Sequence, residues 1–552
     1  MKYLFSKLSF YLKPLVVITI INVILLIVLG AYLEDYEAYF ASFLHGTFTK
    51  PWGSTLDCSS HIILLHVYKH IAFIFPNYNV YGIILFTYNW IILTLLGLVV
   101  YRILRINLSN NSLLLFVLLY GILSVDSFLN IHHTRQTFFL MAAVMGFIES
   151  CRFEGKKISI TFWFLIIVVI IFATLIRFES VWLFSLIYIA AILLQKQFTK
   201  QALLPLFISG LVLILYYNLF IPKISEAKQV YIYKEREIYD RNNIDYAKLN
   251  KTQLLDVNAI MKYGITDKEH YTLTFYDSIS KYNSNNKMLS LADGIKPYSI
   301  IGSFKNSKYN FFRVGNYFIF FILSTLLIIL NNFSNKKRYI FYAAFMFIIP
   351  FAICSYTIVP LRFLVPYLSI LILINVFIYI TTYKLNNTII SFAFVFLLII
   401  FYQATVSKSN YQYLSKDYDR NTSKLNNLSI NRSIKNPIII NNLYPIRFFP
   451  RNPFTKIKKQ DALFLNLNMF GGWEINKDKW TQECHCNALS LKEKINYIIE
   501  NQNLFLVDEE SFKFIQAYLS EKYNLEIKKI NIGNFDSKLL ICKLDYSSNI
   551  KK

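Results

Sequence analysis

Three carboxylates follow the first long apolar segment of the chain, and their types and spacing suggest chemistry. Glu34, Asp35 and Glu37 come shortly after the apolar run 15–29. Ionised carboxylates are costly beside hydrocarbon, so such a cluster needs water, a cation or a basic partner. A carboxylate can act as general base toward a hydroxyl group, or as a ligand for Mg²⁺ or Mn²⁺. Asp35 is the leading candidate for either role, and a solvated acidic loop end is the simpler alternative.

Charged and polar side chains also interrupt or end later apolar segments. The candidates for binding an anion, their possible acidic partners and two adjacent histidines are Arg135, Arg177, Glu179, Arg362, Asp126, His132 and His133. Ionisable groups at such depth usually face a cavity and pair with one another or with a ligand. Arginine suits a phosphate because its planar fork can donate two hydrogen bonds to one anion. The pattern predicts a cavity with an acidic and a basic side; charged turns, a snorkelling arginine and histidines without a role are the alternatives.

The composition is that of a polytopic α-helical membrane protein. Of 552 residues, 55% are hydrophobic and only 16% are charged, whereas soluble proteins have about 25% charged residues. Many apolar runs approach the roughly 18 residues typical of a spanning helix. The net charge is +24, and much of it flanks the membrane spans and loops, where anionic lipid headgroups are the expected partner. No nucleic-acid-binding motif accompanies it, so the lipid bilayer is predicted as a partner and nucleic acid is not.

The positions of lysine and arginine predict the topology. Lys2, Lys7 and Lys13 precede the first apolar run, which indicates a cytoplasmic N-terminus. Basic clusters at successive inner turns then predict about 11 spans, namely 14–32, 81–100, 113–124, 136–148, 160–175, 181–194, 203–220, 317–330, 339–354, 363–380 and 389–402. Residues 61–75 are predicted as an interfacial helix within an outer loop, 33–78, because charges break the run; a span there would invert the topology. The predicted location is a bacterial plasma (inner) membrane.

Two domains are predicted. Residues 1–402 form the transmembrane helical domain, which includes a long extracytoplasmic segment, 221–312. Residues 403–552 form a small extracytoplasmic α/β domain. Its expected strands are 436–441, 462–467, 504–507, 525–530 and 538–544, and its expected helices are 491–502 and 509–522. Cys484 and Cys486 lack the second ligand pair of a zinc site, and a disulfide from either one to Cys542 stays open.

Two short motifs resemble those of membrane glycosyltransferases of the GT-C class. Residues 34–39, Glu-Asp-Tyr-Glu-Ala-Tyr, look like the acidic motif that follows the first span of that class, although the order of the acidic residues differs. Residues 361–366, Leu-Arg-Phe-Leu-Val-Pro, are similar to an arginine motif that opens a late span. Many spans followed by an outer soluble domain also match the class. The chain resembles uncharacterised bacterial polytopic proteins as well, a likeness that implies no function.

The GT-C resemblance implies transfer of a sugar from a polyprenyl-phosphate donor to a glycan or lipid acceptor on the outer face. It implies that Asp35 acts as base or cation ligand, supported by Glu34 or Glu37. Arg177 and Arg362 would hold the lipid phosphate as charge develops on it.

Three other functions stay open. The first is a polymerase or ligase of lipid-linked surface polysaccharide repeats, which would use residues 132–136. The second is a transporter or flippase, disfavoured because the chain has no internal repeat and few Gly or Pro residues. The third is a scaffold whose tail binds a partner.

Under the GT-C resemblance, Glu179 would orient Arg177.

Overall fold

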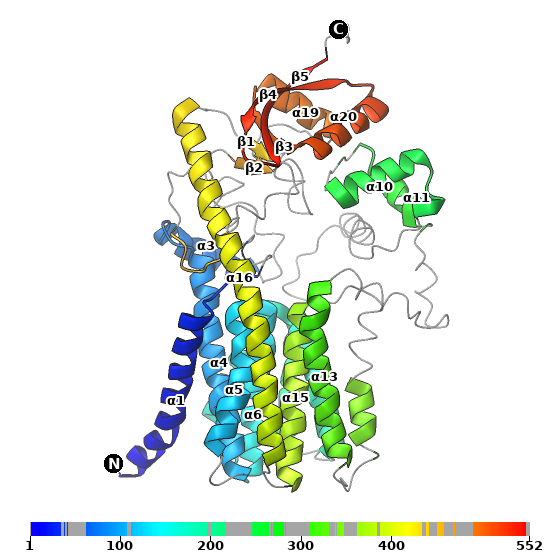
Figure 1. The fold of residues 1–552 in the computed structure, drawn as a ribbon. Helices are drawn as coiled ribbons and strands as arrows, with labels where there is room; N and C mark the ends of the chain where they lie inside the picture. Colours follow the sequence, from blue (N-terminus) through cyan, green and yellow to red (C-terminus); the bar gives the residue numbers. More distant parts are fainter. Residues whose placement is uncertain are drawn as a thin grey trace.

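The computed structural model describes the following residues: 2–34, 38, 41, 62–107, 112–195, 200–216, 246–263, 267, 269–280, 282, 308–330, 337, 339–346, 361–383, 387–432, 438–440, 450–456, 467–469 and 490–547. Long helices stand side by side in a bundle, and a small sheet with its own helices lies beyond one end of it (Figure 1). We call this end of the bundle the domain end and the opposite one the far end.

Apolar helices make up the bundle. They are α1 Lys2–Val28, α4 Val80–Asn107, α5 Ser112–Leu129, α6 His133–Phe153, α7 Ile160–Gln195, α8 Lys200–Leu215, α13 Lys308–Leu330, α15 Leu361–Tyr383 and α16 Asn387–Arg432. Among the described residues, three helices are long and apolar enough to cross a membrane, in α4, α7 and α16, and six shorter apolar segments accompany them. Each of the predicted spans contains described helix. The chain is therefore a helical protein, and some of its helices are long and apolar enough to span a membrane. The number of spans stays a prediction.

Helix α6 lies at the centre of the bundle. All of its residues from His133 to Met145 are buried, and it packs against α4 and α7. A Cβ atom on Gly146 would lie 2.8 Å from Cγ1 of Val99, so α6 and α4 approach each other closely there. Small residues allow such approach in membrane helices. Because α6 is enclosed by other helices, its first turn can carry polar side chains away from lipid.

Helix α3, Ile62–Ile74, covers the domain end of the bundle beside α4 and α7 (Figure 1). Leu64, Tyr68 and Ala72 recur every four residues and are buried, so they form the face that packs on the bundle. His66 and His70 are exposed. One buried apolar face and one exposed polar face are what is expected of the interfacial helix predicted over 61–75.

Helix α16 continues well past residue 403, where the sequence placed a domain boundary. The helix runs unbroken through this position to Arg432. The sequence 387–432 contains neither Gly nor Pro, so it has no helix-breaking residue between its apolar first part and its polar end. Near its end, Lys424 Nζ donates to the carbonyl oxygen of Phe535 at 2.9 Å. The helix therefore joins the bundle directly to the C-terminal domain.

The C-terminal domain contains a five-stranded mixed sheet of order β2-β1-β3-β5-β4. Its strands are β1 Ile438–Ile440, β2 Leu467–Met469, β3 Leu504–Asp508, β4 Ile527–Asn534 and β5 Leu539–Tyr546. Strand β1 pairs in parallel with β2 and β3, and β5 pairs antiparallel with β3 and β4. Four strands coincide with predicted ones, whereas β2 begins at Leu467, where a predicted strand ended.

The two faces of this sheet pack against different partners. Phe505 and Val507 share an apolar cluster with α19, Leu491–Glu500, and α20, Glu509–Tyr523. Leu504 and Leu506 point to the other face, in a cluster that includes Leu425 of α16 and residues at the domain end of the bundle. Alternation along β3 therefore fixes which side faces the bundle.

Part of the long segment 221–312 belongs to the C-terminal domain. Its helices α10, Lys251–Tyr263, and α11, Leu273–Ser280, share the apolar cluster of α20. Lys522 Nζ pairs with Asp256 at 2.7 Å, and Tyr523 donates to Asp267 at 2.7 Å. Burial raises the pKa of the Asp256 carboxyl although Lys522 opposes the shift. The described middle of the segment is thus an added layer of the domain.

Candidate functional site

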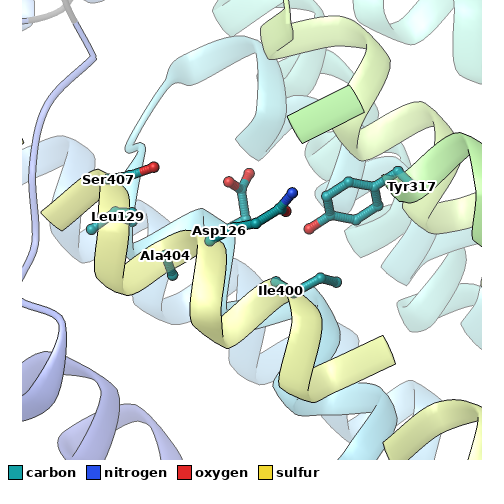
Figure 2. Close-up of a pocket in the computed structure, with 7 residues that line it drawn as sticks. Asp126, Leu129, Tyr317, Ile400, Ala404 and Ser407 are labelled. Atoms are coloured by element: carbon teal, nitrogen blue, oxygen red, sulfur yellow. The ribbon is translucent and has the colours of Figure 1, made fainter. Parts of the chain in front are cut away.

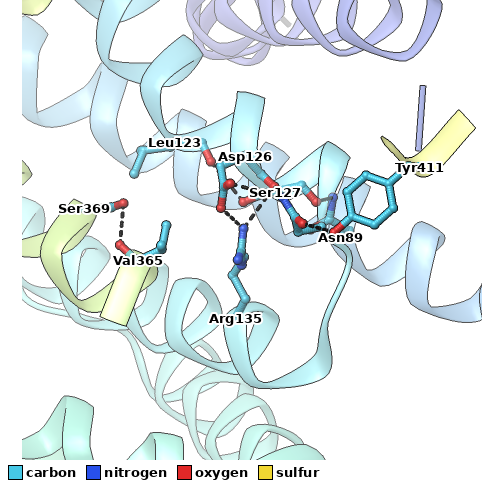
Figure 3. A network of polar contacts seen from close by, with 9 residues as sticks. Asn89, Leu123, Asp126, Ser127, Arg135, Val365, Ser369 and Tyr411 are labelled. Carbon is cyan, nitrogen blue, oxygen red and sulfur yellow. Dashed lines mark hydrogen bonds and ion pairs between the residues drawn. The ribbon is translucent and has the colours of Figure 1, made fainter. Parts of the chain in front are cut away.

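Asp126 and Arg135 form a buried ion pair at the domain end (Figure 3). Arg135 Nη1 contacts the Asp126 carboxylate and also donates to the Asp126 carbonyl oxygen at 2.9 Å. Asn130 Nδ2 donates to Asp126 Oδ1 at 3.1 Å. The sequence placed Asp126 and Arg135 in an outer turn between spans, but both are helical, because α5 extends to Leu129 and α6 begins at His133. The helix ends therefore fix the geometry of this pair.

Arg135 uses only part of its hydrogen-bonding capacity. Its residue is 1% exposed, and its Nε and Nη2 have no hydrogen-bond partner among the described residues. The hydroxyl of Thr134 is in the same condition. Both residues lie in the first turn of α6, where the helix dipole favours negative charge. A buried guanidinium at a helix N-terminus can bind an anion such as a phosphate through two nitrogens that donate to no other group described.

His132 and His133 are buried at the same helix start. His132 Nδ1 accepts a hydrogen bond from the backbone N–H of Thr134 at 3.0 Å, so it caps α6. The two rings stack with centroids 4.3 Å apart, and each residue is 1% exposed. The sequence predicted these histidines on the outer turn as site candidates. Because both histidines are buried beside Arg135, they form part of the protein wall around the site.

The acidic stretch after α1 reaches this region through its backbone. Leu33 forms a parallel bridge with Ile131, and the N–H of Glu34 donates to the carbonyl oxygen of Ile131 at 3.2 Å. The connection between α5 and α6 therefore lies beside the start of the acidic cluster. Asp35 and Glu37, the other predicted catalytic carboxylates, lie outside the described residues.

The predicted pair Arg177 and Glu179 lies at a break in α7. Arg177 has φ −161° and ψ 94°, an extended conformation between two helical pieces. Next to the break, Ser180 Oγ donates to the Thr134 carbonyl oxygen at 3.4 Å. Ile176 shares an apolar cluster with Leu33 and Ile131. The break therefore adjoins the start of α6, as one shared site requires; the side chain of Glu179 is outside the described part of the structure.

Arg362 is the second residue of α15. Its side chain is also outside the described part of the structure, so its place relative to Arg135 stays a prediction.

A small pocket opens beside Asp126, between α5, α13 and α16 (Figure 2). Its lining consists of Asp126, Leu129, Tyr317, Ile400, Gln403, Ala404 and Ser407. It has room for about one water molecule. The hydroxyl of Tyr317 points toward it from the side opposite α5 (Figure 2). A polar group that enters here reaches the carboxylate that holds Arg135.

Arg451 and Tyr411 also belong to this region, although neither was predicted from the sequence. Arg451 is 1% exposed, and its guanidinium lies 5.9 Å from the ring centroid of Tyr411. Tyr411 stacks on Tyr32 at 5.3 Å and donates to Asn130. The two prolines that flank Arg451-Asn452 predict a turn. No local signal could show that this turn is inserted beside α1.

Among the described residues, no group of three or more His, Cys, Asp or Glu side chains could hold the predicted divalent cation. Its predicted ligand Asp35, and the pair Cys484 and Cys486, lie outside those residues. Cys542 is a buried free thiol whose Sγ donates to the Phe505 carbonyl oxygen at 3.3 Å. Burial raises the pKa of this thiol to about 12, so it stays protonated at neutral pH.

Four separate segments thus meet at the domain end: the residues after α1, the α5–α6 connection, the break in α7 and the turn around Arg451. They bring an acidic chain segment close to an enclosed arginine with unused donors. A search of protein-family models finds none that matches this chain, and a search of curated proteins finds no similar sequence.

Proposed function

We propose that the chain is a membrane glycosyltransferase that moves a sugar from a polyprenyl-phosphate donor to a glycan or lipid acceptor of the cell envelope. The reaction takes place at the domain end, on the extracytoplasmic side of a bacterial plasma membrane. One observation carries the proposal. The chain leading into the acidic cluster is fixed by the Glu34 N–H to Ile131 hydrogen bond, directly beside the helix start that holds Arg135.

The chemistry requires two kinds of group. A carboxylate, Asp35 with Glu34 or Glu37 in support, takes the proton of the acceptor hydroxyl. The acceptor oxygen then bonds to the anomeric carbon of the sugar, and the bond from that carbon to the phosphate oxygen breaks. The electron pair leaves with the phosphate, so polyprenyl phosphate is the second product. Arg135 stabilises the charge that grows on this phosphate, together with Arg177 and Arg362.

The outer surface of the bundle supports a lipid donor. Large apolar side chains are exposed on helices that would face lipid, including Ile160 at 86%, Phe207 at 69% and Phe341 at 73%. In water such exposure is costly, whereas lipid tails solvate it. A polyprenyl chain has the same chemistry and can lie along these surfaces while its phosphate reaches the domain end.

Transfer by the purified chain in lipid nanodiscs tests the proposal. A panel of radiolabelled polyprenyl-phosphate sugars is supplied with cell-envelope acceptors, in Mg²⁺, Mn²⁺ or EDTA. We expect Asp35→Asn to lower transfer at least 100-fold and Arg135→Lys to lower it at least 10-fold, because the ammonium cannot supply the lost fork. Arg152→Lys is the matched control, since Arg152 pairs with Glu149 at the far end. Full activity of Asp35→Asn would refute the proposal.

A polymerase or ligase of lipid-linked polysaccharide repeats is the second candidate. The observation in its favour is that His132, His133 and Arg135 are enclosed together at the start of α6. Product length distinguishes the two enzymes. A transferase adds a single sugar to each acceptor, whereas a polymerase gives a ladder of repeats on a gel.

A further inference from the structure

Residues Pro450–Lys456, here called the strap, leave the C-terminal domain between β1 and β2 and reach the bundle. The carbonyl oxygen of Arg451 accepts the N–H of Leu33 at 2.7 Å. On the other side of the same extended chain, Ile131 N–H donates to the Tyr32 carbonyl oxygen at 2.9 Å. The residues just before the acidic cluster are therefore held between the strap and the α5–α6 connection.

The strap is also fixed to the start of α4. Asn79 caps that helix, since its Oδ1 accepts the Gly82 N–H at 3.0 Å. The backbone N–H of Asn79 donates to the Thr455 carbonyl oxygen at 3.3 Å. Next to it, the ring of Phe454 packs edge-to-face on Phe86 with centroids 4.8 Å apart. The strap thus has one anchor on α4 and one on the chain after α1.

The side chain of Arg451 links the strap to the buried ion pair. It is enclosed and lies over Tyr411, whose hydroxyl donates to Asn130. Asn130 in turn donates to Asp126 at 3.1 Å. Tyr411 and Asp126 both belong to one network of polar contacts (Figure 3). A single path of contacts therefore runs from the strap to the carboxylate that holds Arg135.

We infer that the strap is a positioning element, through which the C-terminal domain sets the place of the acidic cluster relative to Arg135. Extended chain at the end of a helix needs partners for its backbone groups, and the Arg451 carbonyl is the partner of Leu33. Displacing the strap removes that partner and leaves Glu34 held on one side. The effect on catalysis rests on the proposed function, whereas the effect on the backbone does not.

Gly82→Ala tests the inference. The added Cβ would lie 2.7 Å from Nδ2 of Asn79, the anchor on α4, and 2.8 Å from Cα of Pro453, a backbone atom of the strap that must move. Gly146→Ala is the matched control, because its Cβ meets a side chain, Cγ1 of Val99, also at 2.8 Å but inside the bundle. Amide hydrogen exchange at Leu33 in nanodiscs should accelerate at least 10-fold in Gly82→Ala and stay within twofold in Gly146→Ala.

Phe454→Ala is the second variant. Phe454 is 46% exposed, so the chain tolerates the loss of its ring even if Gly82→Ala does not fold. We expect exchange at Leu33 to accelerate about 3-fold, with restoration in Phe454→Tyr, which keeps the ring on Phe86. In transfer assays both damaging variants should lower kcat at least 5-fold and leave KM for the polyprenyl donor within twofold, because Arg135 still holds the phosphate.

Unchanged exchange at Leu33 in both Gly82→Ala and Phe454→Ala would overturn the inference. Accelerated exchange with a lower kcat supports it. Accelerated exchange in a chain whose wild type transfers no sugar refutes the proposed function, while the strap keeps its role in placing the backbone.

Discussion

The two ends of the bundle each hold enclosed arginine–carboxylate pairs, and the pairs differ in how fully their donors are used. At the far end, Arg102 Nε and Nη2 donate to the two oxygens of Glu154 at 3.2 and 2.8 Å. There Arg152 likewise uses two nitrogens on Glu149. At the domain end, Arg135 uses Nη1 alone on Asp126, and its other two nitrogens have no hydrogen-bond partner among the described residues.

The difference separates a structural pair from a candidate binding group. Buried polar groups in native proteins are nearly always satisfied, and an exception needs a reason. A guanidinium with unused donors is costly unless a ligand completes it. The far-end pairs are complete without any ligand, so they serve to hold α4, α6 and the following turn together. The domain-end pair is the one that a phosphate would complete.

Arg135→Leu should have the largest effect on stability. It leaves the Asp126 carboxylate enclosed without its cation, which costs about 3–5 kcal/mol. Arg102→Leu should cost less, because Lys156 still pairs with the Glu154 carboxylate at 2.6 Å. Unfolding in mixed micelles measures both. The double variant Asp126→Asn/Arg135→Gln should recover most of the loss, and equal losses at the two ends would remove the distinction.

Two tyrosines allow a finer comparison. Tyr188 at the far end donates to a carboxylate, Glu149 Oε1, at 2.7 Å, whereas Tyr411 at the domain end donates to the neutral amide of Asn130. Hydrogen bonds to charged groups contribute about 1.5–3 kcal/mol and neutral ones about 1 kcal/mol. Tyr188→Phe should therefore destabilise more than Tyr411→Phe in the same unfolding assay. The reverse order would mean that Tyr411 matters chiefly for its contacts with Arg451 and Tyr32.

The smallest expected effect is a pH dependence at the far end. The hydrogen bonds from Arg102 hold the pKa of Glu154 below its ordinary value, and Lys156 adds to the shift. A carboxyl with a lowered pKa in the folded state stabilises the fold above its unfolded pKa of about 4.3, and this contribution is lost as the pH falls further. Glu154→Gln should thus flatten the decline of unfolding free energy below about pH 4.5. If the unfolding free energy of Glu154→Gln declined with pH as steeply as that of the wild type, the prediction would be wrong.

Local sequence pattern predicted most helices and strands. Long apolar runs became the bundle helices, and the short apolar stretches 504–507 and 538–544 became β3 and β5. The extent of α16 was missed because the change from apolar to polar residues at 403 predicts the end of a span, whereas a helix keeps its backbone geometry across such a change. Helix ends were also misplaced around Asp126 and Arg135, since polar residues inside an enclosed helix look like a turn.

Only part of the candidate site could be predicted from the sequence. Residue type identified Asp126, His132 and Arg135, because charges inside apolar runs stand out. The strap was not predictable, since the contact between Leu33 and Arg451 joins residues more than four hundred positions apart. Such contacts depend on the whole fold and leave no period or spacing in the chain.

The length of α16 has a consequence for the acceptor. A continuous helix of 46 residues spans about 69 Å at 1.5 Å per residue, more than twice the roughly 30 Å hydrocarbon core of a bilayer. Where the apolar part of α16 crosses a bilayer, its polar part would carry the sheet beyond the hydrocarbon core. An acceptor bound by the C-terminal domain would then approach through water, which suits a hydrated, elongated molecule such as a growing glycan.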